Sequence, residues 1–394
     1  MTVTDRDIQG TCDPGLNAVR DEFLRNFTER DDVGAAVSVT VDGETVIDLW
    51  AGHTDADRKR PWERDTLVHV YSTTKGLTAL CAHMLVDRGL LDVDEPVATY
   101  WPEFAQAGKE AIPVRWLLTH RAGLTGPGER LTRAEVRDWD RICSALGATT
   151  PWWEPNTMSG YHALTFGFLV GEVVRRISGR SLGTFLREEV AARLGADLHV
   201  GVPESELGRC ADMIPGTPPD LVGAVRDGGS GQEVHPGLKA LNNCPMGDAN
   251  DPLTRMAEMP AANGHVTARG LATVYGALAN GGAIGDTRLV NPEAIDLMRQ
   301  PQPAMPDLLL SQIAGGDFQW GFGFMLNHLG ASGPNPRSFG HGGAGGSYAF
   351  ADPENRVSYA YVMNRMSGGT MGEDLRSISL VDALYRGLGR EAGR

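Results

Sequence analysis

A serine and a lysine three residues apart are the strongest candidates for chemistry in this chain. Ser72 and Lys75 lie in the stretch VYSTTK at 70–75. If the stretch is helical, this spacing places both side chains on one face, about one turn apart. An alcohol beside an amine is a nucleophile beside its base, and the positive end of a helix dipole would favour an oxyanion near Ser72. Because such a pair is also common on ordinary helices, its meaning depends on the rest of the chain.

The residues that follow Lys75 predict the helix that this pair requires. Apolar side chains recur there at a spacing of three to four residues, and Gly89 is placed to end the helix. The stripe consists of Leu77, Leu80, Met84 and Leu85.

Two further stretches carry side chains that could serve the same chemistry. Tyr161 lies just before an apolar helical stripe, which places a phenol in a loop at the start of a helix. Residues 340–347, GHGGAGGS, lie at the edge of a predicted strand. Glycines in such a place let the backbone approach a ligand closely. Each stretch also has an ordinary explanation, a half-buried tyrosine in one case and a glycine-rich turn in the other.

The bulk composition excludes several classes of protein. The 394 residues carry a formal net charge of −14, which argues against a nucleic-acid or anionic-membrane surface as a main partner. The five cysteines are scattered and form no C-x-x-C pair, so we expect neither a zinc site nor a disulfide framework. We find no signal-peptide core and no run of about 18 apolar residues. These features predict a cytoplasmic protein with reduced thiols, no bound metal and no membrane partner.

The periodicity of the chain predicts an α+β fold made from both ends of the sequence. The runs at 35–41 and 44–50, joined by Asp42-Gly43, indicate a β-hairpin. Alternating apolar residues at 318–326, and runs at 348–350 and 357–362, also read as strands. We expect helices over the following ranges: 76–88, 96–100, 113–118, 131–146, 163–178, 182–193 and 268–280.

The simplest architecture is therefore one antiparallel β-sheet, flanked by N- and C-terminal helices, with a mainly helical domain inserted between its strands. We assign residues 1–70 and 285–394 to the sheet domain. Residues 71–284 form the helical domain, which carries Ser72 and Tyr161. Within it, residues 199–260 show little periodicity, so the sequence does not assign them to particular elements.

Taken together, these sites resemble the three motifs of the serine β-lactamase and penicillin-binding-protein superfamily. The motifs are Ser72 with Lys75, then Tyr161, then the triplet 341–343, His-Gly-Gly. The chain looks most like the esterase branch, the family VIII carboxylesterases. The likeness extends from about residue 30 to 365 and includes the stretches WLLTHRAGL at 116–124, GHVTAR at 264–269 and LANGG at 278–282.

The resemblance implies a mechanism in which Ser72 attacks an acyl carbonyl. Lys75 and Tyr161 would share the proton, with Tyr161 passing it to the leaving alcohol. The backbone N–H groups of Ser72 and Ala344 would form the oxyanion hole. Water would then cleave the acyl-enzyme, and no cofactor is implied.

This chain departs from the β-lactamase and peptidase pattern in ways that favour a neutral substrate. Lys-Thr-Gly is replaced by His341, Gly342 and Gly343, which removes a point charge and a hydroxyl. Ala163 stands where the tyrosine motif usually ends in Asn. His341 could assist the proton relay or line the substrate pocket, and we expect the triplet to line the pocket. The adjacent Trp152 and Trp153 could form a wall of the acyl site, although such a pair is more often part of a core.

Two other motifs match known signatures without the context that those signatures need. Residues 179–183, GRSLG, match the nucleophile elbow G-x-S-x-G, but a helix precedes Ser181 where the elbow requires a strand. Residues 340–345 match G-x-G-x-x-G, but they run into a strand where a dinucleotide site opens a helix. We reject both interpretations.

The predicted function is therefore a serine hydrolase that acts on small-molecule carboxylic esters with short to medium acyl chains. Two alternatives share the scaffold: a β-lactamase or D-amino-acid peptidase, and an enzyme that transfers the acyl group to a small-molecule alcohol. A third alternative, from another class, is a binding module without catalysis. The sequence does not reveal the oligomeric state.

Overall fold

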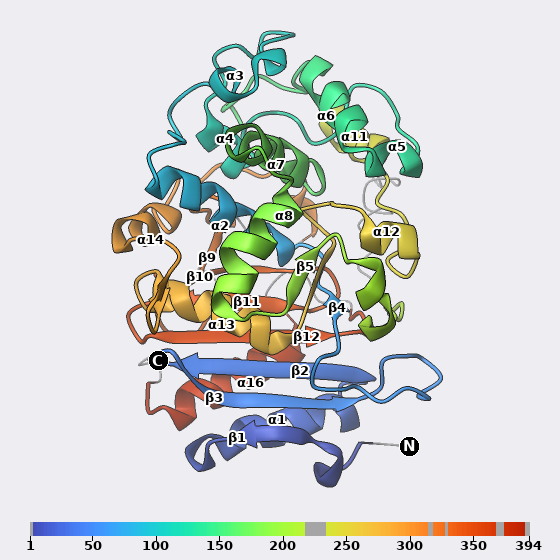
Figure 1. Cartoon of the computed structure of the whole chain (residues 1–394), viewed down its shortest axis with the longest axis vertical. Helices are drawn as coiled ribbons and strands as arrows, with labels where there is room; N and C mark the ends of the chain where they lie inside the picture. Colours follow the sequence, from blue (N-terminus) through green and yellow to red (C-terminus); the bar gives the residue numbers. More distant parts are fainter. Residues whose placement is uncertain (1–2, 217–233, 314–317, 328–329, 368–373, 391–394) are drawn as a thin grey trace.

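A seven-stranded antiparallel sheet forms the centre of the protein (Figure 1). The computed structural model describes residues 3–216, 234–313, 318–327, 330–367 and 374–390. The strand order is β1-β3-β2-β12-β11-β10-β9. These strands are β1 Gln9–Cys12, β2 Gly34–Val41, β3 Glu44–Gly52, β9 Met325–Leu326, β10 Phe339–Gly342, β11 Tyr348–Asp352 and β12 Val357–Met363.

Two smaller sheets and a set of helices complete the described structure. The small sheets pair β4 Val68–His69 and β5 Leu198–Val200 with β6 Gly264–Val266, and β7 Ala283–Ile284 with β8 Thr287–Arg288. The helices are α1 Asn17–Thr28, α2 Thr74–Asp87, α3 Val97–Tyr100, α4 Val114–Leu118, α5 Arg133–Arg137, α6 Trp139–Ala148, α7 Thr165–Ser178, α8 Leu182–Leu186, α9 Ala192–Leu194, α11 Pro236–Ala240, α12 Pro252–Met256, α13 Ala268–Ala279, α14 Pro292–Met298, α15 Leu310–Ile313 and α16 Leu375–Gly387. In the described part of the chain, no helix is both long and apolar enough to cross a bilayer.

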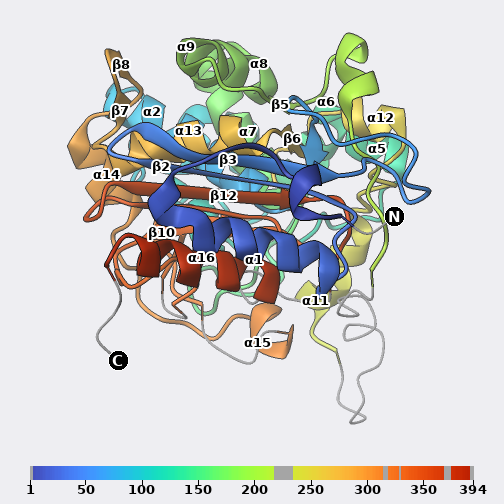
Figure 2. The same cartoon turned by 90° about the horizontal axis from the view of Figure 1, so that it is seen from below.

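The two ends of the chain meet in the middle of the large sheet. Strand β12 pairs with β2 from Val357 opposite Val41 to Met363 opposite Ala35. Every residue of β12 is buried, because helices cover both faces of the sheet. Helices α1 and α16 lie together on one face, and α13 lies on the other (Figure 2). The predicted antiparallel sheet with flanking N- and C-terminal helices is thus confirmed.

The hairpin predicted at Asp42-Gly43 joins β2 to β3. Both residues have positive φ, +53° and +84°. A two-residue turn of this kind matches the right-handed twist of the paired strands, which is why Asp-Gly is favoured there.

Helix α2 is the central element of the helical part. It contacts α7, α8, α14 and β10, and every residue from Thr74 to Leu85 is buried. A helix that is buried all round needs apolar residues on every face rather than on one stripe. Its first turn is therefore held on all sides, which fixes Lys75 relative to its neighbours.

The sequence prediction was wrong about residues 318–326. Only Met325 and Leu326 are in a strand, although the apolar alternation indicated a continuous one. Gly323 has a φ of +85°, and the Gly321 N–H bonds to the Phe324 carbonyl, so the backbone turns back on itself. The alternating side chains consequently divide between two clusters instead of sharing one face of the sheet.

The division into a sheet domain and an inserted helical domain remains a prediction. Helix α13 falls within the range 71–284 that the sequence assigned to the helical part, yet it packs on strands β2, β11 and β12. Of the range 199–260, residues 217–233 lie outside the described structure.

Candidate active site

Ser72 lies in a tight turn between strand β4 and helix α2. The N–H groups of Thr73, Thr74 and Lys75 bond to the carbonyls three residues earlier, so the turn leads directly into the helix. The preceding residue, Tyr71, has a φ of +44°. A left-handed conformation costs a bulky residue on the order of 1–3 kcal/mol and persists where the surroundings impose it, often at functional sites. The turn presents a partly exposed Ser72 at the end of a buried helix.

Lys75 is fully buried and lies next to Ser72. Its Nζ is 3.1 Å from Ser72 Oγ and donates to the carbonyls of Ala163, at 2.8 Å, and Ala261, at 3.0 Å. Burial lowers the pKa of this amine well below its ordinary value of 10.5. A neutral amine has two N–H donors and one lone pair. The two carbonyls satisfy the donors, and the lone pair is then left for the Ser72 hydroxyl.

The Tyr161 ring lies over the same amine, although it comes from a loop 86 residues later in the chain. Lys75 Nζ is 4.6 Å from the centre of the ring. The Tyr161 hydroxyl is buried and makes no regular hydrogen bond within the described residues. The neighbouring Ser72 hydroxyl acts to lower the pKa of this phenol. Burial is the larger effect and raises the pKa of the phenol above its ordinary value of 10. The phenol is thus protonated at neutral pH, whereas burial favours the neutral amine.

Asp307 fixes the loop that carries Tyr161, and sequence reasoning missed it. Its buried carboxylate accepts hydrogen bonds from the Ser159 hydroxyl, at 2.9 Å, and from the Tyr161 N–H, at 3.2 Å. It also accepts the N–H groups of Leu309 and Leu310. Asp307 lies 146 residues from Tyr161 in the sequence, so no local pattern could have identified it.

Three more rings surround Tyr161. Trp320 stacks on it with ring centres 5.9 Å apart, His120 lies at 4.8 Å and His341 at 6.3 Å. The sequence indicated no role in the site for His120 or Trp320. Trp320 Nε1, His341 Nε2 and the Tyr161 hydroxyl are all buried without a partner in the described structure. Buried polar atoms are rarely left unpaired, so this arrangement is typical of a site that water or a ligand completes.

His341, whose ring centre lies 6.3 Å from that of Tyr161, begins the glycine-rich triplet that was predicted to line the pocket. His341 lies on β10, and its Nδ1 is 2.7 Å from the Gly342 carbonyl. That contact makes Nδ1 the protonated nitrogen and leaves Nε2 as an acceptor. Burial lowers the pKa of His341 to about 3, so the imidazole is neutral at physiological pH. His341 therefore offers no positive charge to an anionic substrate.

The turn after His341 is tied to the turn that carries Ser72. A Cβ on Gly343 would lie 2.2 Å from the Val70 carbonyl oxygen, so only glycine fits there. The Ser347 hydroxyl lies 2.8 Å from the same carbonyl and 3.0 Å from the Thr73 hydroxyl.

This close contact leaves two N–H groups unused. In the described structure neither the Ser72 N–H nor the Ala344 N–H bonds to a protein acceptor, and both residues are partly exposed. Two free donors on adjoining turns are what an oxyanion hole needs. Their assignment as the oxyanion hole remains a prediction.

The two tryptophans predicted to line the acyl site contribute differently. Trp152 is half buried, and its N–H bonds to the Gly126 carbonyl at 2.8 Å. Trp153 is buried and packs against His162, and a Cβ on Gly160 would lie 2.4 Å from its ring. Within the described residues no ring contact or hydrogen bond joins either tryptophan to Ser72, Lys75 or Tyr161. Trp153 packs against the two residues that flank Tyr161, Gly160 and His162. A role for either tryptophan in substrate binding remains a prediction.

The structure agrees with the rejection of the two other motifs. Ser181 caps helix α8: its Oγ accepts the Thr184 N–H at 3.2 Å and bonds to Glu258 at 2.6 Å. Residues 340–345 run from β10 into the turn before β11, and no helix follows them. Neither stretch has the strand-turn-helix context of the motif that it resembles.

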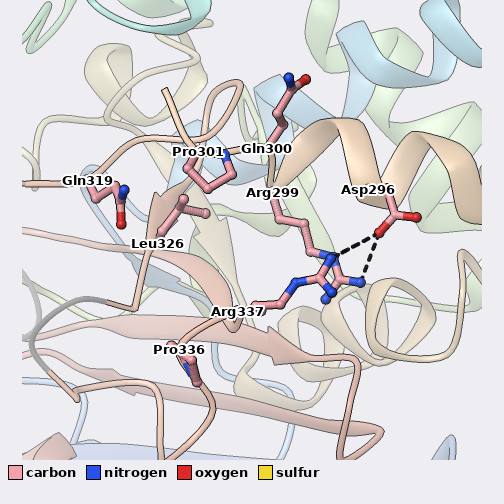
Figure 3. A pocket seen from close by; sticks show the side chains of 8 residues that line it. All are labelled: Asp296, Arg299, Gln300, Pro301, Gln319, Leu326, Pro336 and Arg337. Carbon is pink, nitrogen blue, oxygen red and sulfur yellow. Dashed lines mark hydrogen bonds and ion pairs between the residues drawn. The ribbon is translucent and has the colours of Figure 1, made fainter. Parts of the chain in front are cut away.

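A cavity of about 520 Å³ near helix α14 is a separate feature (Figure 3). Its two arginines, Arg299 and Arg337, both pair with Asp296 and Glu354, so the cations are balanced by carboxylates. No residue of the Ser72 site lines it. The lining residues are Asp296, Arg299, Gln300, Pro301, Gln319, Leu326, Pro336 and Arg337.

Comparison with known proteins gives consistent matches over nearly the whole chain. The sequence profile of the Beta-lactamase family matches residues 22–383. The chain is 37% identical over 379 residues to Esterase/beta-lactamase LipL of Mycobacterium tuberculosis, covering 92% of this chain and 84% of LipL.

Two solved structures are similar over comparable lengths. One is a family VIII carboxylesterase, with 43% identity, a TM-score of 0.88, and coverage of 96% of this chain and 99% of that one. The other is a penicillin-binding protein homologue from Caulobacter crescentus, with 40% identity, a TM-score of 0.88, and coverage of 97% and 100%.

Proposed function

The chain belongs to the Beta-lactamase family, and from that premise we propose that it is a serine hydrolase that cleaves carboxylic esters through an acyl-enzyme on Ser72. One observation carries the proposal: a buried amine lies 3.1 Å from Ser72 Oγ, beneath the ring of a tyrosine whose buried hydroxyl is a neighbour of the same serine. The esterase names of its relatives agree with this chemistry.

The opposite pKa shifts support Lys75 as the base and Tyr161 as the acid. Burial lowers the pKa of Lys75 and raises that of Tyr161. Two groups whose pKa values are pushed apart are suited to opposite roles. Lys75 therefore accepts the proton of the Ser72 hydroxyl, and Tyr161 supplies a proton to the departing alcohol.

The proposed reaction has two balanced steps. Ser72 Oγ bonds to the acyl carbon while its proton passes to Lys75, and the carbonyl oxygen becomes an oxyanion facing the N–H groups of Ser72 and Ala344. The bond to the alcohol then breaks, the alcohol takes the Tyr161 proton, and the Lys75 ammonium restores it. Water cleaves the acyl-enzyme with the same two groups acting in reverse order.

The composition of the third motif supports a neutral ester substrate. His341 replaces the lysine of the β-lactamases and is uncharged, so a substrate carboxylate gains no ion pair from it. We expect short to medium acyl chains and no cofactor. Because one relative is named as both an esterase and a β-lactamase, we also expect a slow reaction with nitrocefin, well below the rate for p-nitrophenyl butyrate.

A cytoplasmic location remains part of this proposal. It is supported by the five cysteines, which are all free and four of which are buried.

The decisive test uses two serine variants and p-nitrophenyl butyrate. Ser72→Ala should reduce kcat by several orders of magnitude, because the covalent path is lost. Ser181→Ala is the matched control at the other candidate serine, and it should retain wild-type activity. An inactive wild-type enzyme, or an active Ser72→Ala variant, would refute the proposed function. Product analysis with competing alcohols would reveal acyl transfer.

A further inference from the structure

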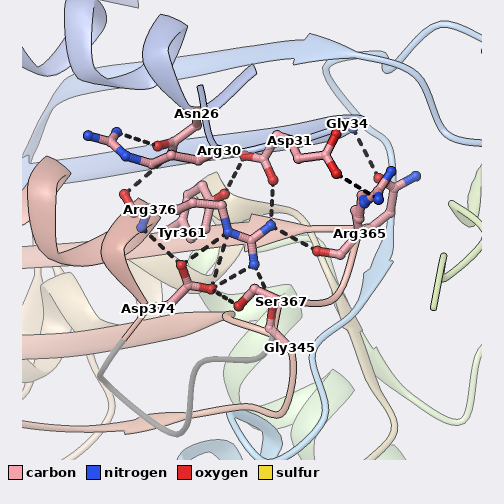
Figure 4. A network of polar contacts seen from close by, with 12 residues as sticks. Asn26, Arg30, Asp31, Gly34, Gly345, Tyr361, Arg365, Ser367, Asp374 and Arg376 are labelled. Atoms are coloured by element: carbon pink, nitrogen blue, oxygen red, sulfur yellow. Dashed lines mark hydrogen bonds and ion pairs between the residues drawn. The ribbon is translucent and has the colours of Figure 1, made fainter. Parts of the chain in front are cut away.

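A buried ionic cluster lies against the turn that carries Gly345, the residue after Ala344 (Figure 4). Arg376, on helix α16, is 3% exposed and pairs with Asp32 at 2.6 Å and with Asp374 at 2.7 Å. Burial raises the pKa of the Asp32 carboxyl to about 6, so its desolvation outweighs the attraction of Arg376. Buried ion pairs often stabilise a fold no better than apolar residues of the same size would.

The same guanidinium reaches the turn directly. Arg376 Nη2 donates to the carbonyl oxygen of Gly345 at 2.6 Å, and the Ser367 N–H donates to that oxygen at 3.0 Å. Gly345 directly follows Ala344, the residue whose N–H is the second candidate oxyanion donor. The Ala344 N–H shares its peptide plane with the Gly343 carbonyl, and the Gly345 carbonyl shares its plane with the Gly346 N–H. Because the Gly346 N–H donates to the Gly343 carbonyl at 3.2 Å, fixing the Gly345 carbonyl also restrains the plane that holds the Ala344 N–H.

The backbone of the turn is shaped to fit against this cluster. Gly346 has a φ of +121°, and a Cβ built there would lie 2.1 Å from Asp374 Oδ2 and 2.5 Å from Arg376 Nη2. A side chain at that position would displace the ion pair. The turn thus touches the cluster on one side and, through Gly343 and Ser347, the Ser72 segment on the other.

We propose that Arg376 is a positioning residue for the oxyanion hole: through the Gly345 carbonyl it fixes the Ala344 N–H relative to Ser72. This inference rests on the proposed function. Asp32 and Asp374 neutralise and orient the guanidinium. A fork of several N–H donors can serve two carboxylates and a carbonyl at once, which a lysine ammonium at this position cannot reproduce.

Replacing Arg376 with lysine tests this role. The variant keeps the charge but loses the fork, so the turn should shift. Misplacement by about 1 Å can cost about 100-fold in rate, so we expect kcat for p-nitrophenyl butyrate to fall about 10- to 100-fold while KM stays within about twofold. Arg255→Lys is the matched control, because Arg255 is also buried and donates to the carbonyls of Ala249 and Ala211, both at 3.2 Å. Its kcat should not change.

A second measurement separates positioning from simple destabilisation. The inhibitor is a trifluoromethyl ketone analogue of butyrate esters. Ser72 Oγ adds to its carbonyl carbon, the serine proton passes to Lys75, and the carbonyl oxygen becomes an oxyanion in the hole. In Arg376→Lys its Ki should rise by the same factor as kcat/KM falls. A lower melting temperature with wild-type kcat and Ki would show that Arg376 is only structural and would overturn the proposal.

A variant with a smaller perturbation keeps the test valid if Arg376→Lys does not fold. Asp374→Asn preserves size and can still cap helix α16, but it removes one charge that orients the guanidinium. It should lower kcat about 3- to 10-fold with a parallel rise in Ki, and unchanged values would refute the positioning role. Failure of the proposed function looks different, since the wild-type enzyme would then not hydrolyse the ester.

Discussion

Replacing Tyr161 with phenylalanine should leave the protein as stable as the wild type while removing most of its activity on alkyl esters. The hydroxyl is buried and makes no regular hydrogen bond in the described structure, although the Ser72 hydroxyl lies near it. Leaving such a group unpaired costs about 1–3 kcal/mol, so its removal should not lower the free energy of unfolding and can raise it by up to about that amount. Thermal or urea unfolding measures this directly.

The loss of activity should depend on the leaving group. Tyr161 is proposed to protonate the departing alcohol, and general acid catalysis contributes about 100- to 10,000-fold. An alkoxide needs that proton, whereas p-nitrophenolate leaves without it. We therefore expect kcat/KM for ethyl butyrate to fall by about that factor, and kcat/KM for p-nitrophenyl butyrate to fall much less.

Tyr275→Phe provides the matched control for this experiment. The Tyr275 hydroxyl is likewise buried without a partner in the described residues, but it plays no part in the proposed reaction. Its loss should change neither substrate's rate. Equal losses for the two esters in Tyr161→Phe would refute the assignment of Tyr161 as the acid, and a large drop in stability would refute the view that its hydroxyl is unpaired.

Two further predictions concern the base and the turn. The value of kcat/KM should rise with pH as Lys75 loses its proton, with a midpoint well below 10.5. The profile should show no inflection from His341, whose pKa is about 3. A His341→Gln variant with an altered midpoint would contradict this prediction. Gly343→Ala should lower kcat about 100-fold, because its Cβ would lie 2.2 Å from the Val70 carbonyl oxygen, whereas Gly208→Ala, with open space around it, should behave as the wild type in the same assay.

Local sequence patterns predicted the features that depend on neighbouring residues. The spacing of Ser72 and Lys75 placed their side chains together, and Asp42-Gly43 identified its hairpin. The meeting of Tyr161 with Lys75 was expected only from the resemblance to a family, since residues 86 positions apart share no local signal.

The features that the sequence did not reveal depend on contacts between distant segments. Asp307 and Arg376 act on residues far along the chain, and an isolated aspartate or arginine carries no signature. Trp320 was misplaced for a different reason: apolar alternation indicated a strand, but Gly323 lets the backbone turn, so the ring contacts Tyr161.

The central claim is that Ser72 carries the acyl group during turnover, and mass spectrometry of the acid-quenched enzyme tests it most directly. With p-nitrophenyl butyrate as substrate, one butyryl group should appear on the peptide that contains Ser72, and Ser72→Ala should show none. A butyryl group on any other residue, or rapid turnover without a covalent adduct, would contradict the account.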